Sequence, residues 1–380
     1  MSDVSLPWQT ELSALRDKID AIDRQVVDLL SRRKQQVEHV VELKKAHNLQ
    51  VYHPAREEDL ISARRQQARA AGLCPDYIEE LYRIIMRRSR MEQTGQMARK
   101  AVKPGAKVLI VGGTGEMGRY FVNCFESAGY EVRSMGSRDW PKIEALCAGI
   151  DLCIISVSIN RTAEVIAKIA PYLRPETVLT DVTSIKRVPL DAMMNAHPGP
   201  VLGLHPLFGP TTSTLDKQIV VATPGRDDAA CQWVIDQFSL WGAVMVMSDA
   251  DEHDEIMEFV QSLRHFATFA FGQFLAARKV PLARTLEFSS PIYRLELGMV
   301  GRLFAQDASL YAEIIFATPE RRALLKDYIN SMANNLAMLE NGDKEAFKSQ
   351  FHKIAEWFGP FGEQAMRESS FIIDKLIERF

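Results

Sequence analysis

The sequence predicts a multidomain chain: an all-α N-terminal domain over residues 1–98, an α/β domain over 99–248 and an all-α C-terminal domain over 249–380. Three observations lead to this division. Apolar residues recur at helical spacing in the first hundred residues, short apolar runs alternate with helical stretches in the middle, and the last third is almost wholly helical in pattern. With 380 residues, the chain is long enough for two or three domains that each bury a core.

Composition and charge narrow the class of protein. The hydrophobic fraction of 47% and the charged fraction of 25% are ordinary for a globular protein, and the net charge of −3 gives no reason to expect nucleic acid or an anionic membrane as a partner. No apolar run reaches the roughly 20 residues of a membrane span, and residues 1–7 show no secretory-signal pattern. The five cysteines lack C-x-x-C spacing, so we expect free thiols, a cytoplasmic location and no metal.

The first element is a long helix with an apolar seam. Its apolar residues recur at spacings of three and four: Leu12, Leu15, Ile19, Ile22, Val26 and Leu29. Periodicity alone also fits a coiled-coil dimerisation arm. The next seam positions, however, are Arg33 and Gln36, and a guanidinium on an apolar seam is costly unless an anion meets it there.

Further cations on this helix indicate an anion pocket. Lys44 lies eleven residues, or about three turns, beyond Arg33, so both side chains project from nearly one face. Arg16 lies about 100° around the helix from that face, which is too far to serve the same pocket on the same chain. A symmetric partner helix could supply Arg16 instead.

Two shorter helical segments follow the turn at Tyr52. The first opens with Arg56-Glu57, and the second, residues 76–96, carries Ser89 and Gln93 one turn apart. Cations and neutral hydrogen-bonding groups that converge between helices suit a small dicarboxylate ligand.

This pattern resembles the helical chorismate mutase family, which it matches in order and spacing over about residues 8–97. The resemblance implies an intertwined dimer whose long first helix crosses between subunits, in agreement with the position of Arg16. The implied reaction, rearrangement of chorismate to prephenate, is unimolecular and requires no nucleophile. Such an enzyme holds the reactive conformer and stabilises charge that develops on the ether oxygen.

The resemblance also implies roles for single residues. Three arginines would bind the substrate carboxylates: Arg16, Arg33 and Arg56. Lys44 and Gln93 would contact the ether oxygen, and Glu57 would hold the ring hydroxyl. Ser89 would be a further substrate contact. His53 departs from the pattern, because family members carry an acid or an apolar residue there.

A glycine motif opens the middle domain. The apolar run 108–111 leads into Gly113-x-Gly115-x-x-Gly118 and then into an amphipathic segment, residues 119–127. In this strand–turn–helix context the motif predicts a Rossmann-type dinucleotide-binding domain. We assign Gly113 to the tight turn, Gly115 to the approach of the pyrophosphate, and Gly118 to close helix–strand packing. The expected cofactor-binding residues here are Gly113, Thr114, Gly115, Glu116, Met117, Gly118 and Ser156.

The rest of this domain predicts a mostly parallel sheet and raises a question about the cofactor. Further strand-like runs occur at residues 130–135, 152–157, 178–182, 201–205, 219–222 and 244–247. An acid at the end of the second strand would bind the ribose of NAD, but no acid occurs there before Asp139. Ser137 and Arg138 could equally accept the 2′-phosphate of NADP. We take NAD as the cofactor and keep NADP as the alternative.

Two segments at strand ends carry candidate catalytic residues. In an open α/β sheet, the carboxyl ends of parallel strands line the ligand crevice. One such segment runs from Asp181 through Ser184 to Lys186, and another contains His205, which stands beside a proline and between two glycines at the end of a strand. A histidine in this position favours a functional role over a structural one. We interpret His197, in a separate loop, as a surface residue or a support for the site.

These segments resemble the prephenate dehydrogenase family, with a match from about residue 105 to 360. It includes Gly203-Leu-His-Pro and the stretches 263–270, 290–296 and 300–307. The implied reaction removes the hydroxyl proton of prephenate as a hydride moves to the nicotinamide. The ring then loses CO₂ and becomes aromatic.

The second resemblance likewise implies residue roles. His205 would be the base, and Ser184 would hydrogen-bond the same hydroxyl or orient the nicotinamide. Arg302 would pair with a substrate carboxylate, for which a planar guanidinium gives bidentate geometry. Three further substrate-binding candidates are Lys186, His265 and Arg294. For Arg294 a structural salt bridge is an equal alternative.

The C-terminal domain is expected to dimerise. Helical stretches are predicted at residues 256–277, 293–303, 310–316 and 321–340. Apolar residues recur at helical spacing in the first of them: Phe259, Leu263, Phe266, Ala270 and Phe274. We interpret them as a dimer core rather than a ligand pocket, and the aromatic segment that begins at Trp357 as packing.

Together, the two resemblances predict a homodimeric, bifunctional enzyme of tyrosine biosynthesis that acts on chorismate and prephenate. They also imply feedback inhibition by tyrosine. Two alternatives stay open at this point: a non-catalytic, dinucleotide-sensing dimeric regulator, and a dehydrogenase of another cyclohexadiene acid such as arogenate. The regulator leaves Arg33, Lys44 and the His205 segment without a purpose.

Overall fold

The computed structural model describes residues 7–47, 49, 51–97 and 99–377. The chain forms two compact units. The first comprises the chain up to Val157, together with Glu164–Val182 and Leu190–Ser248. The second comprises Asp249 onward, together with Ser158–Ala163 and Thr183–Pro189.

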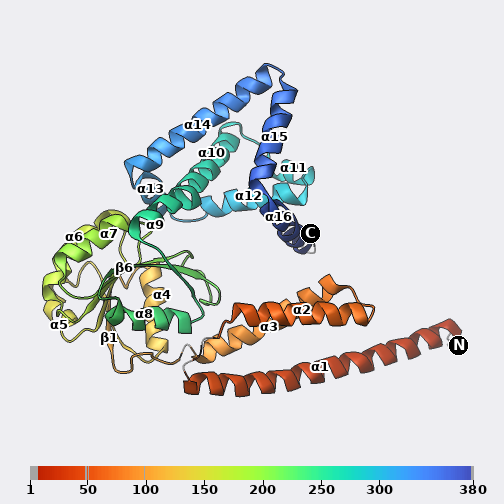
Figure 1. Cartoon of the computed structure of the whole chain (residues 1–380), viewed down its shortest axis with the longest axis horizontal. Helices are drawn as coiled ribbons and strands as arrows, with labels where there is room; N and C mark the ends of the chain where they lie inside the picture. Colours follow the sequence, from red (N-terminus) through yellow and green to blue (C-terminus); the bar gives the residue numbers. More distant parts are fainter. Residues whose placement is uncertain (1–6, 48, 50, 98, 378–380) are drawn as a thin grey trace, which may run out of the picture. The chain divides into compact units, whose positions relative to one another are not determined.

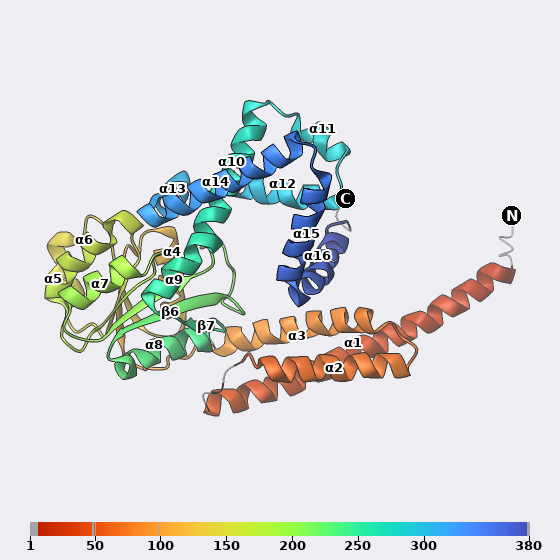
Figure 2. The same cartoon turned by 45° about the horizontal axis from the view of Figure 1, so that its top comes forward.

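Three helices form the N-terminal part of the first unit: α1 (Pro7–His47), α2 (Pro54–Ala70) and α3 (Pro75–Met97). Proline at the first position of α2 and α3 suits a helix start, because its missing N–H would have no partner there. The predicted long helix and the two shorter ones are thus confirmed. The N-terminal end of α1 extends beyond α2 and α3 (Figures 1 and 2). Its predicted apolar seam is accordingly exposed in a single chain.

A seven-stranded sheet forms the rest of the first unit, in the order β2-β1-β3-β4-β5-β6-β7. Its strands are β1 (Lys107–Val111), β2 (Glu131–Met135), β3 (Leu152–Ile155), β4 (Val178–Asp181), β5 (Val201–Pro206), β6 (Ile219–Arg226) and β7 (Val244–Met247). All neighbouring strands pair in parallel except β5 and β6, which are antiparallel. β1, β3 and β4 are almost completely buried because helices cover both faces of the sheet.

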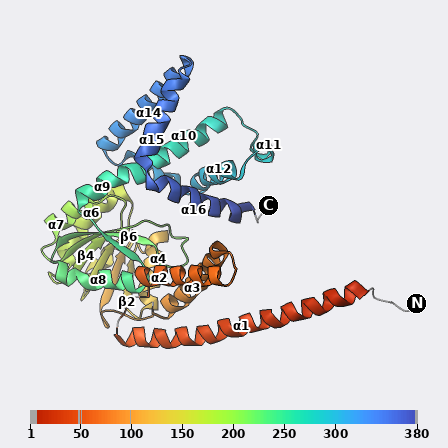
Figure 3. The same cartoon turned by 45° about the vertical axis from the view of Figure 1, so that its right-hand side comes forward.

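The helices around the sheet form two cores (Figure 3). Their bounds are α4 (Glu116–Ser127), α5 (Ile143–Cys147), α6 (Ile159–Ile169), α7 (Arg187–Ala196) and α8 (Asp228–Leu240), with short 3₁₀ turns at Trp140–Lys142 and Ala170–Tyr172. One core packs aromatic residues of α4 and α8 on the sheet, including Phe121, Phe125 and Phe238. The other packs aliphatic residues from α5, α6 and α7 on the opposite face. The predicted α/β domain is confirmed.

The second unit is helical. Its main elements are α9 (Ala250–Met257), α10 (Arg264–Ala277), α11 (Leu282–Glu287), α12 (Pro291–Phe304), α13 (Ala308–Phe316), α14 (Pro319–Glu340), α15 (Lys344–Phe358) and α16 (Pro360–Ile377). A π-helical segment, Glu258–Leu263, lies between α9 and α10, so the helix predicted over 256–277 is not regular throughout. At Gly272, α10 crosses α12 so closely that a Cβ would lie 2.2 Å from the Phe304 ring.

Side-chain caps explain where many of these helices begin. Asp249, Ser290, Asp307, Thr318 and Asp343 each accept a hydrogen bond from a backbone N–H in the first turn of α9, α12, α13, α14 and α15. Such caps satisfy N–H groups that have no partner within the helix. The Ser290 cap also fixes the start of α12, the helix that carries the candidate residues Arg294 and Arg302.

Large apolar side chains remain exposed on the second unit of a single chain. Trp357 is 80% exposed, and Phe259 and Phe274 are both more than half exposed. Surfaces of this kind usually mark an interaction site. Among the described residues, no helix is long and apolar enough to cross a membrane.

Candidate functional sites

The turn after β1 forms a tight cradle, but its left-handed residue is not the predicted one. Gly112, not Gly113, has the positive φ of 86°. A Cβ on Gly112 would lie 2.1 Å from the carbonyl oxygen of Ser156, at the end of β3. Gly113 is glycine for another reason, since a Cβ there would meet the Ser134 hydroxyl at 2.3 Å. The assignment of the tight turn to Gly113 was therefore wrong by one residue.

The start of α4 suits a dinucleotide pyrophosphate. A Cβ on Gly118 would lie 2.2 Å from the Gly112 carbonyl oxygen, so only glycine lets this helix begin against the turn. Gly115 is the N-cap and has extended backbone, with no side-chain cap. The first N–H groups of α4 are thus left for an anion, with the positive end of the helix dipole behind them. The cradle fits a bound dinucleotide.

After β2, an acid turns back toward the end of the strand. The Asp139 carboxylate accepts a hydrogen bond from the Gly136 N–H at 2.9 Å. Ser137 and Arg138 lie exposed between these two residues. From the sequence alone, Asp139 stood three positions beyond residue 136, where the acid was expected.

His205 lies at the same edge of the sheet as the glycine turn. It is the penultimate residue of β5 and is 2% exposed. Since β1, β3, β4 and β5 are parallel, their carboxyl ends share this edge, where Ser156 also follows β3. His197 is buried, and its Nε2 lies 2.7 Å from the Thr177 carbonyl oxygen. A surface position for His197 was therefore wrong, and its role is to support the loop.

The other predicted dehydrogenase residues belong to the second unit. Ser184 is half-buried and Lys186 fully buried. The backbone N–H groups of Lys186 and Arg187 donate to the Asp254 carboxylate at 2.7 and 3.0 Å. Burial raises the pKa of Asp254, but hydrogen bonds from His253 and from these N–H groups outweigh it and lower the pKa overall. An ionised Asp254 thus anchors the segment that carries Ser184 and Lys186.

His265, Arg294 and Arg302 occupy different environments in the second unit. His265 on α10 is buried against Tyr311, and burial, with a smaller effect of Arg264, lowers its pKa to about 4. It is therefore a neutral imidazole near pH 7. Arg294 donates to the Leu286 carbonyl oxygen at 2.5 Å, whereas Arg302 is exposed in the last turn of α12.

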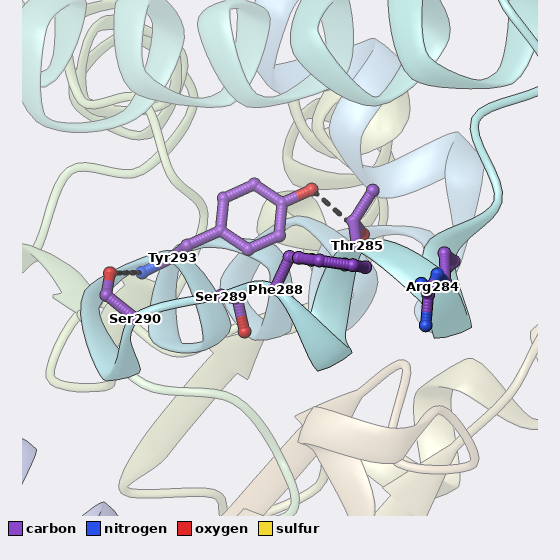
Figure 4. Close-up of a pocket in the computed structure, with 6 residues that line it drawn as sticks. All are labelled: Arg284, Thr285, Phe288, Ser289, Ser290 and Tyr293. Carbon is purple, nitrogen blue, oxygen red and sulfur yellow. Dashed lines mark hydrogen bonds between the residues drawn. The ribbon is translucent and has the colours of Figure 1, made fainter.

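A surface pocket between α11 and α12 contains none of the predicted residues (Figure 4). Arg284, Thr285, Phe288, Ser289, Ser290 and Tyr293 line it. The Tyr293 hydroxyl donates to Thr285 Oγ1 at 3.3 Å, and Arg284 pairs with Glu287 while it covers the Phe288 ring. These polar groups already have partners, so we assign no chemistry to the pocket.

The N-terminal helices bring several predicted residues into one region. Arg33 donates to the Ser89 hydroxyl at 2.7 Å, which joins α1 to α3. Lys44 donates to the Val51 carbonyl oxygen at 2.9 Å. Burial lowers the pKa of Lys44, and the negative charge of Glu57 partly opposes this. Gln93 is buried, and within the described residues its Oε1 has no hydrogen-bond partner.

Two of the predicted mutase residues, Arg16 and Arg56, lie apart from these contacts. Two residues that the sequence analysis did not predict, Arg90 and Lys217, contact Glu57. Arg16 is exposed on α1, about 26 Å along the helix from Arg33, and Arg56 is also exposed. Glu57 forms ion pairs with the buried Arg90 of α3 and with Lys217, which precedes β6. Arg90 had no distinctive sequence signal among the neighbouring arginines, and Lys217 is 160 residues from Glu57.

Comparison with known families assigns both sets of residues to one class of protein. The model of chorismate mutase type II matches residues 15–94. The models of the nucleotide-binding and dimerization domains of prephenate dehydrogenase match residues 132–247 and 249–353. The chain is thus a fusion of a chorismate mutase domain with a prephenate dehydrogenase.

Relatives that match nearly the whole chain identify the family within this class of protein. The T-protein of Enterobacter agglomerans is 45% identical over 359 residues, which cover 94% of this chain and 96% of that protein. The T-protein of Haemophilus influenzae is 40% identical over 365 residues, covering 96% and 97%. The chain belongs to the T-protein family. It is a bifunctional enzyme of tyrosine biosynthesis with chorismate mutase and prephenate dehydrogenase activities, and its oxidation step uses a nicotinamide dinucleotide.

A solved structure shares the fold of the dehydrogenase part. It is the prephenate dehydrogenase of A. aeolicus in complex with hydroxyphenyl propionate and NAD⁺, with a TM-score of 0.54 and 18% identity over 67% of this chain and 98% of that one. The predicted recognition, fold class and enzyme activities are confirmed. The non-catalytic regulator does not apply, and the matched models name prephenate rather than arogenate.

The geometry of the glycine turn leads to a stability prediction. Gly112→Ala should lower the free energy of unfolding by about 1–3 kcal/mol, because alanine must adopt a left-handed backbone. The contact with the Ser156 carbonyl oxygen should add to that cost and weaken dinucleotide binding. Urea unfolding and fluorescence titration with NADH measure the two effects.

Gly129→Ala is the matched control. Gly129 has φ of 87°, and a Cβ there would have nothing within 4 Å. Gly129→Ala therefore measures the cost of the left-handed backbone without a steric contact such as the one between residue 112 and the Ser156 carbonyl oxygen. Equal losses of stability in the two variants, with unchanged dinucleotide affinity, would show that the approach to Ser156 is unimportant.

Proposed function

We propose that the mutase site is built from α1, α2 and α3, with Arg16 supplied by a second copy of the chain. Arg33, Arg56 and Arg16 bind the carboxylates of chorismate, and Ser89 orients Arg33. Lys44 and Gln93 contact the ether oxygen, and Glu57 holds the ring hydroxyl. The observation that carries this proposal is that predicted residues from all three helices interact: Arg33 of α1 donates to Ser89 of α3, and the charge of Glu57 on α2 raises the pKa of Lys44 on α1 against the effect of burial.

The chemistry at this site is positioning and charge stabilisation. Chorismate must adopt a compact conformer, and fixed cations at its carboxylates favour that conformer over extended ones. Negative charge develops on the ether oxygen as the bond breaks, and Lys44 is held to meet it by the Val51 carbonyl oxygen. No proton needs to move, so each group keeps one ionisation state through the reaction.

For the dehydrogenase, we propose His205 as the base that accepts the hydroxyl proton of prephenate. The oxidised nicotinamide, when bound, would supply the acceptor for the hydride that leaves the ring carbon bearing this hydroxyl. Ser184 hydrogen-bonds the hydroxyl, and Arg302 pairs with a carboxylate of the substrate. Further substrate contacts are proposed for Lys186, His265 and Arg294. Because His265 is neutral, it can contribute a hydrogen bond but not an ion pair.

The cofactor is proposed to be NAD in preference to NADP. Residues 113–118 and Ser156 hold the pyrophosphate and nicotinamide half. Asp139 supports the choice of NAD, because its carboxylate reaches back to Gly136 and disfavours a 2′-phosphate there. Ser137 and Arg138 flank the adenosine ribose.

The wider organisation is also a proposal. We propose functional domains over residues 1–98, 99–248 and 249–380, and a homodimer held by α1 and by the apolar surface of the second unit. A cytoplasmic location is supported by five free cysteines, three of them buried. Tyrosine is proposed as a feedback inhibitor, since it shares a para-hydroxyphenyl group and a carboxylate with the reaction product.

The separate location of the two sets of residues predicts separable chemistries. His205→Asn should lower dehydrogenase turnover by about 10²–10⁴-fold, because the base is lost. Conversion of chorismate to prephenate by the same preparation should be unchanged. Both rates are measured with saturating substrate, and circular dichroism checks the fold. A parallel fall of both activities in a folded variant would indicate one shared site.

The proposed cross-subunit position of Arg16 predicts complementation. Arg16→Ala and Lys44→Ala homodimers should each lose most mutase activity. After mixing and refolding, random pairing should restore about a quarter of the wild-type activity, because each heterodimer regains one intact site. Native mass spectrometry verifies that heterodimers form. Their formation without recovered activity would place Arg16 in the same site as Lys44 of its own chain, or in neither.

The cofactor proposal predicts a small effect of Arg138. With prephenate saturating, kcat/KM for NAD should exceed that for NADP by more than tenfold, or about 1.4 kcal/mol. Arg138→Ala should change the NAD value little, and Asp139→Asn should reduce the preference. If the wild type instead prefers NADP and Arg138→Ala reverses this, the arginine binds the 2′-phosphate.

A further inference from the structure

The segment before β6 carries two charged residues that contact the helices of the mutase domain. Lys217 Nζ lies 3.2 Å from Glu57 Oε2 and 4.4 Å from the centre of the Tyr52 ring. The Asp216 carboxylate accepts hydrogen bonds from Arg90 Nε at 3.2 and 3.3 Å. Arg90 in turn pairs with the other oxygen of Glu57. Both oxygens of Glu57 are therefore held, one by each part of the chain.

These four charges form a balanced cluster that is largely shielded from water. The side chains of Arg90, Asp216 and Glu57 are only 9%, 7% and 14% exposed, whereas that of Lys217 is 38% exposed. Two carboxylates face two cations, so loss of one partner leaves an unbalanced charge in a poorly solvated place. Removal of Lys217 would free one oxygen of Glu57. Removal of Asp216 would leave Arg90 with Glu57 as its remaining partner in this cluster.

The backbone around Lys217 is arranged to keep it there. Lys217 has φ of 59°, a left-handed conformation that is uncommon for a residue other than glycine. Its N–H donates to the Gly242 carbonyl oxygen at 2.9 Å. A Cβ on Gly242 would lie 3.2 Å from Asp216 Cα and 3.3 Å from the Thr94 side chain of α3. Strained residues of this kind persist where the surroundings hold them, often at functional sites.

The same junction holds Lys44. Val51, whose carbonyl oxygen accepts from Lys44, packs in a small apolar cluster with Met97 of α3 and Leu240 of α8. Two proposed mutase groups, Lys44 and Glu57, are thus fixed through contacts with the dinucleotide-binding part of the chain.

We propose that Lys217 and Asp216, which belong to the dehydrogenase, are positioning residues for the mutase reaction. They orient the Glu57 carboxylate toward the ring hydroxyl of chorismate, so this inference rests on the role proposed for Glu57. The mutase domain then depends for full activity on a segment of the dehydrogenase, although no residue of that segment touches the substrate.

The test uses the full-length protein and three single variants. Lys217→Met removes the charge while it keeps side-chain length, and it should lower mutase kcat about tenfold by misorienting Glu57. Dehydrogenase kcat/KM with prephenate should stay within twofold. Lys217→Arg, which keeps the positive charge, should retain most of the wild-type mutase rate. Lys279→Met is the matched control, since Lys279 is also an exposed lysine with a positive φ, of 51°, and should leave both activities unchanged.

Glu57→Gln separates this inference from the proposal on which it rests. If Glu57→Gln retains full mutase activity, the assigned role of Glu57 fails. If Glu57→Gln is strongly impaired while Lys217→Met is as active as wild type, only the positioning role fails. In the double variant, Lys217→Met should add no further loss to Glu57→Gln. Additive losses, or a fall in mutase rate that tracks a lower melting temperature and is shared by Lys279→Met, would overturn the inference.

Discussion

The parallel pairing of β1, β3, β4 and β5 is the constraint on which the rest of the first unit depends. It brings the glycine turn, Ser156 and His205 to one edge of the sheet, although they are up to about ninety residues apart in sequence. Because β6 runs antiparallel to β5, the segment between these two strands begins and ends at this edge. The connecting segment 207–218 leaves directly after His205 and Pro206 and ends with Asp216 and Lys217. A single connection thus joins the proposed base of one reaction to the cluster that holds Glu57 in the other.

The N-terminal helices depend on a different kind of support. Most of the apolar seam of α1 is exposed within one chain, and helices α2 and α3 do not reach its N-terminal end (Figure 1). Burial of such a seam requires another copy of the helix or another apolar surface. On the same helix, Arg16 is exposed, whereas Arg33 and Lys44 are partly buried. In the proposed dimer, association of two chains therefore also brings Arg16 of one chain to the carboxylate-binding arginines of the other.

The sequence allowed the long helices, the strand-like runs and the motifs at strand ends to be predicted, because helix and strand periods are local properties. It failed where a residue's role depends on a distant neighbour. Gly112 has a left-handed backbone and lies against the Ser156 carbonyl oxygen, whereas Gly113 lies against Ser134. His197 is buried with its Nε2 hydrogen-bonded to the Thr177 carbonyl oxygen. The pairing of Glu57 with Lys217 spans 160 positions and left no pattern in either segment. Candidate residues that lie within motifs could be proposed from the sequence, whereas residues proposed to act through long-range contacts could not.

The two reactions place unequal demands on positional accuracy. The dehydrogenase relies on a nicotinamide and a base, so part of its chemistry comes from groups with intrinsic reactivity. The mutase has neither, and its rate enhancement must come almost wholly from the placement of charges around one conformer. A displacement of Glu57 or Lys44 by an ångström therefore matters more to the mutase than a comparable shift elsewhere. Attachment of α2 and α3 to the seven-stranded sheet through Arg90, Asp216 and Lys217 supplies rigidity that three helices, one of them partly uncovered, lack by themselves.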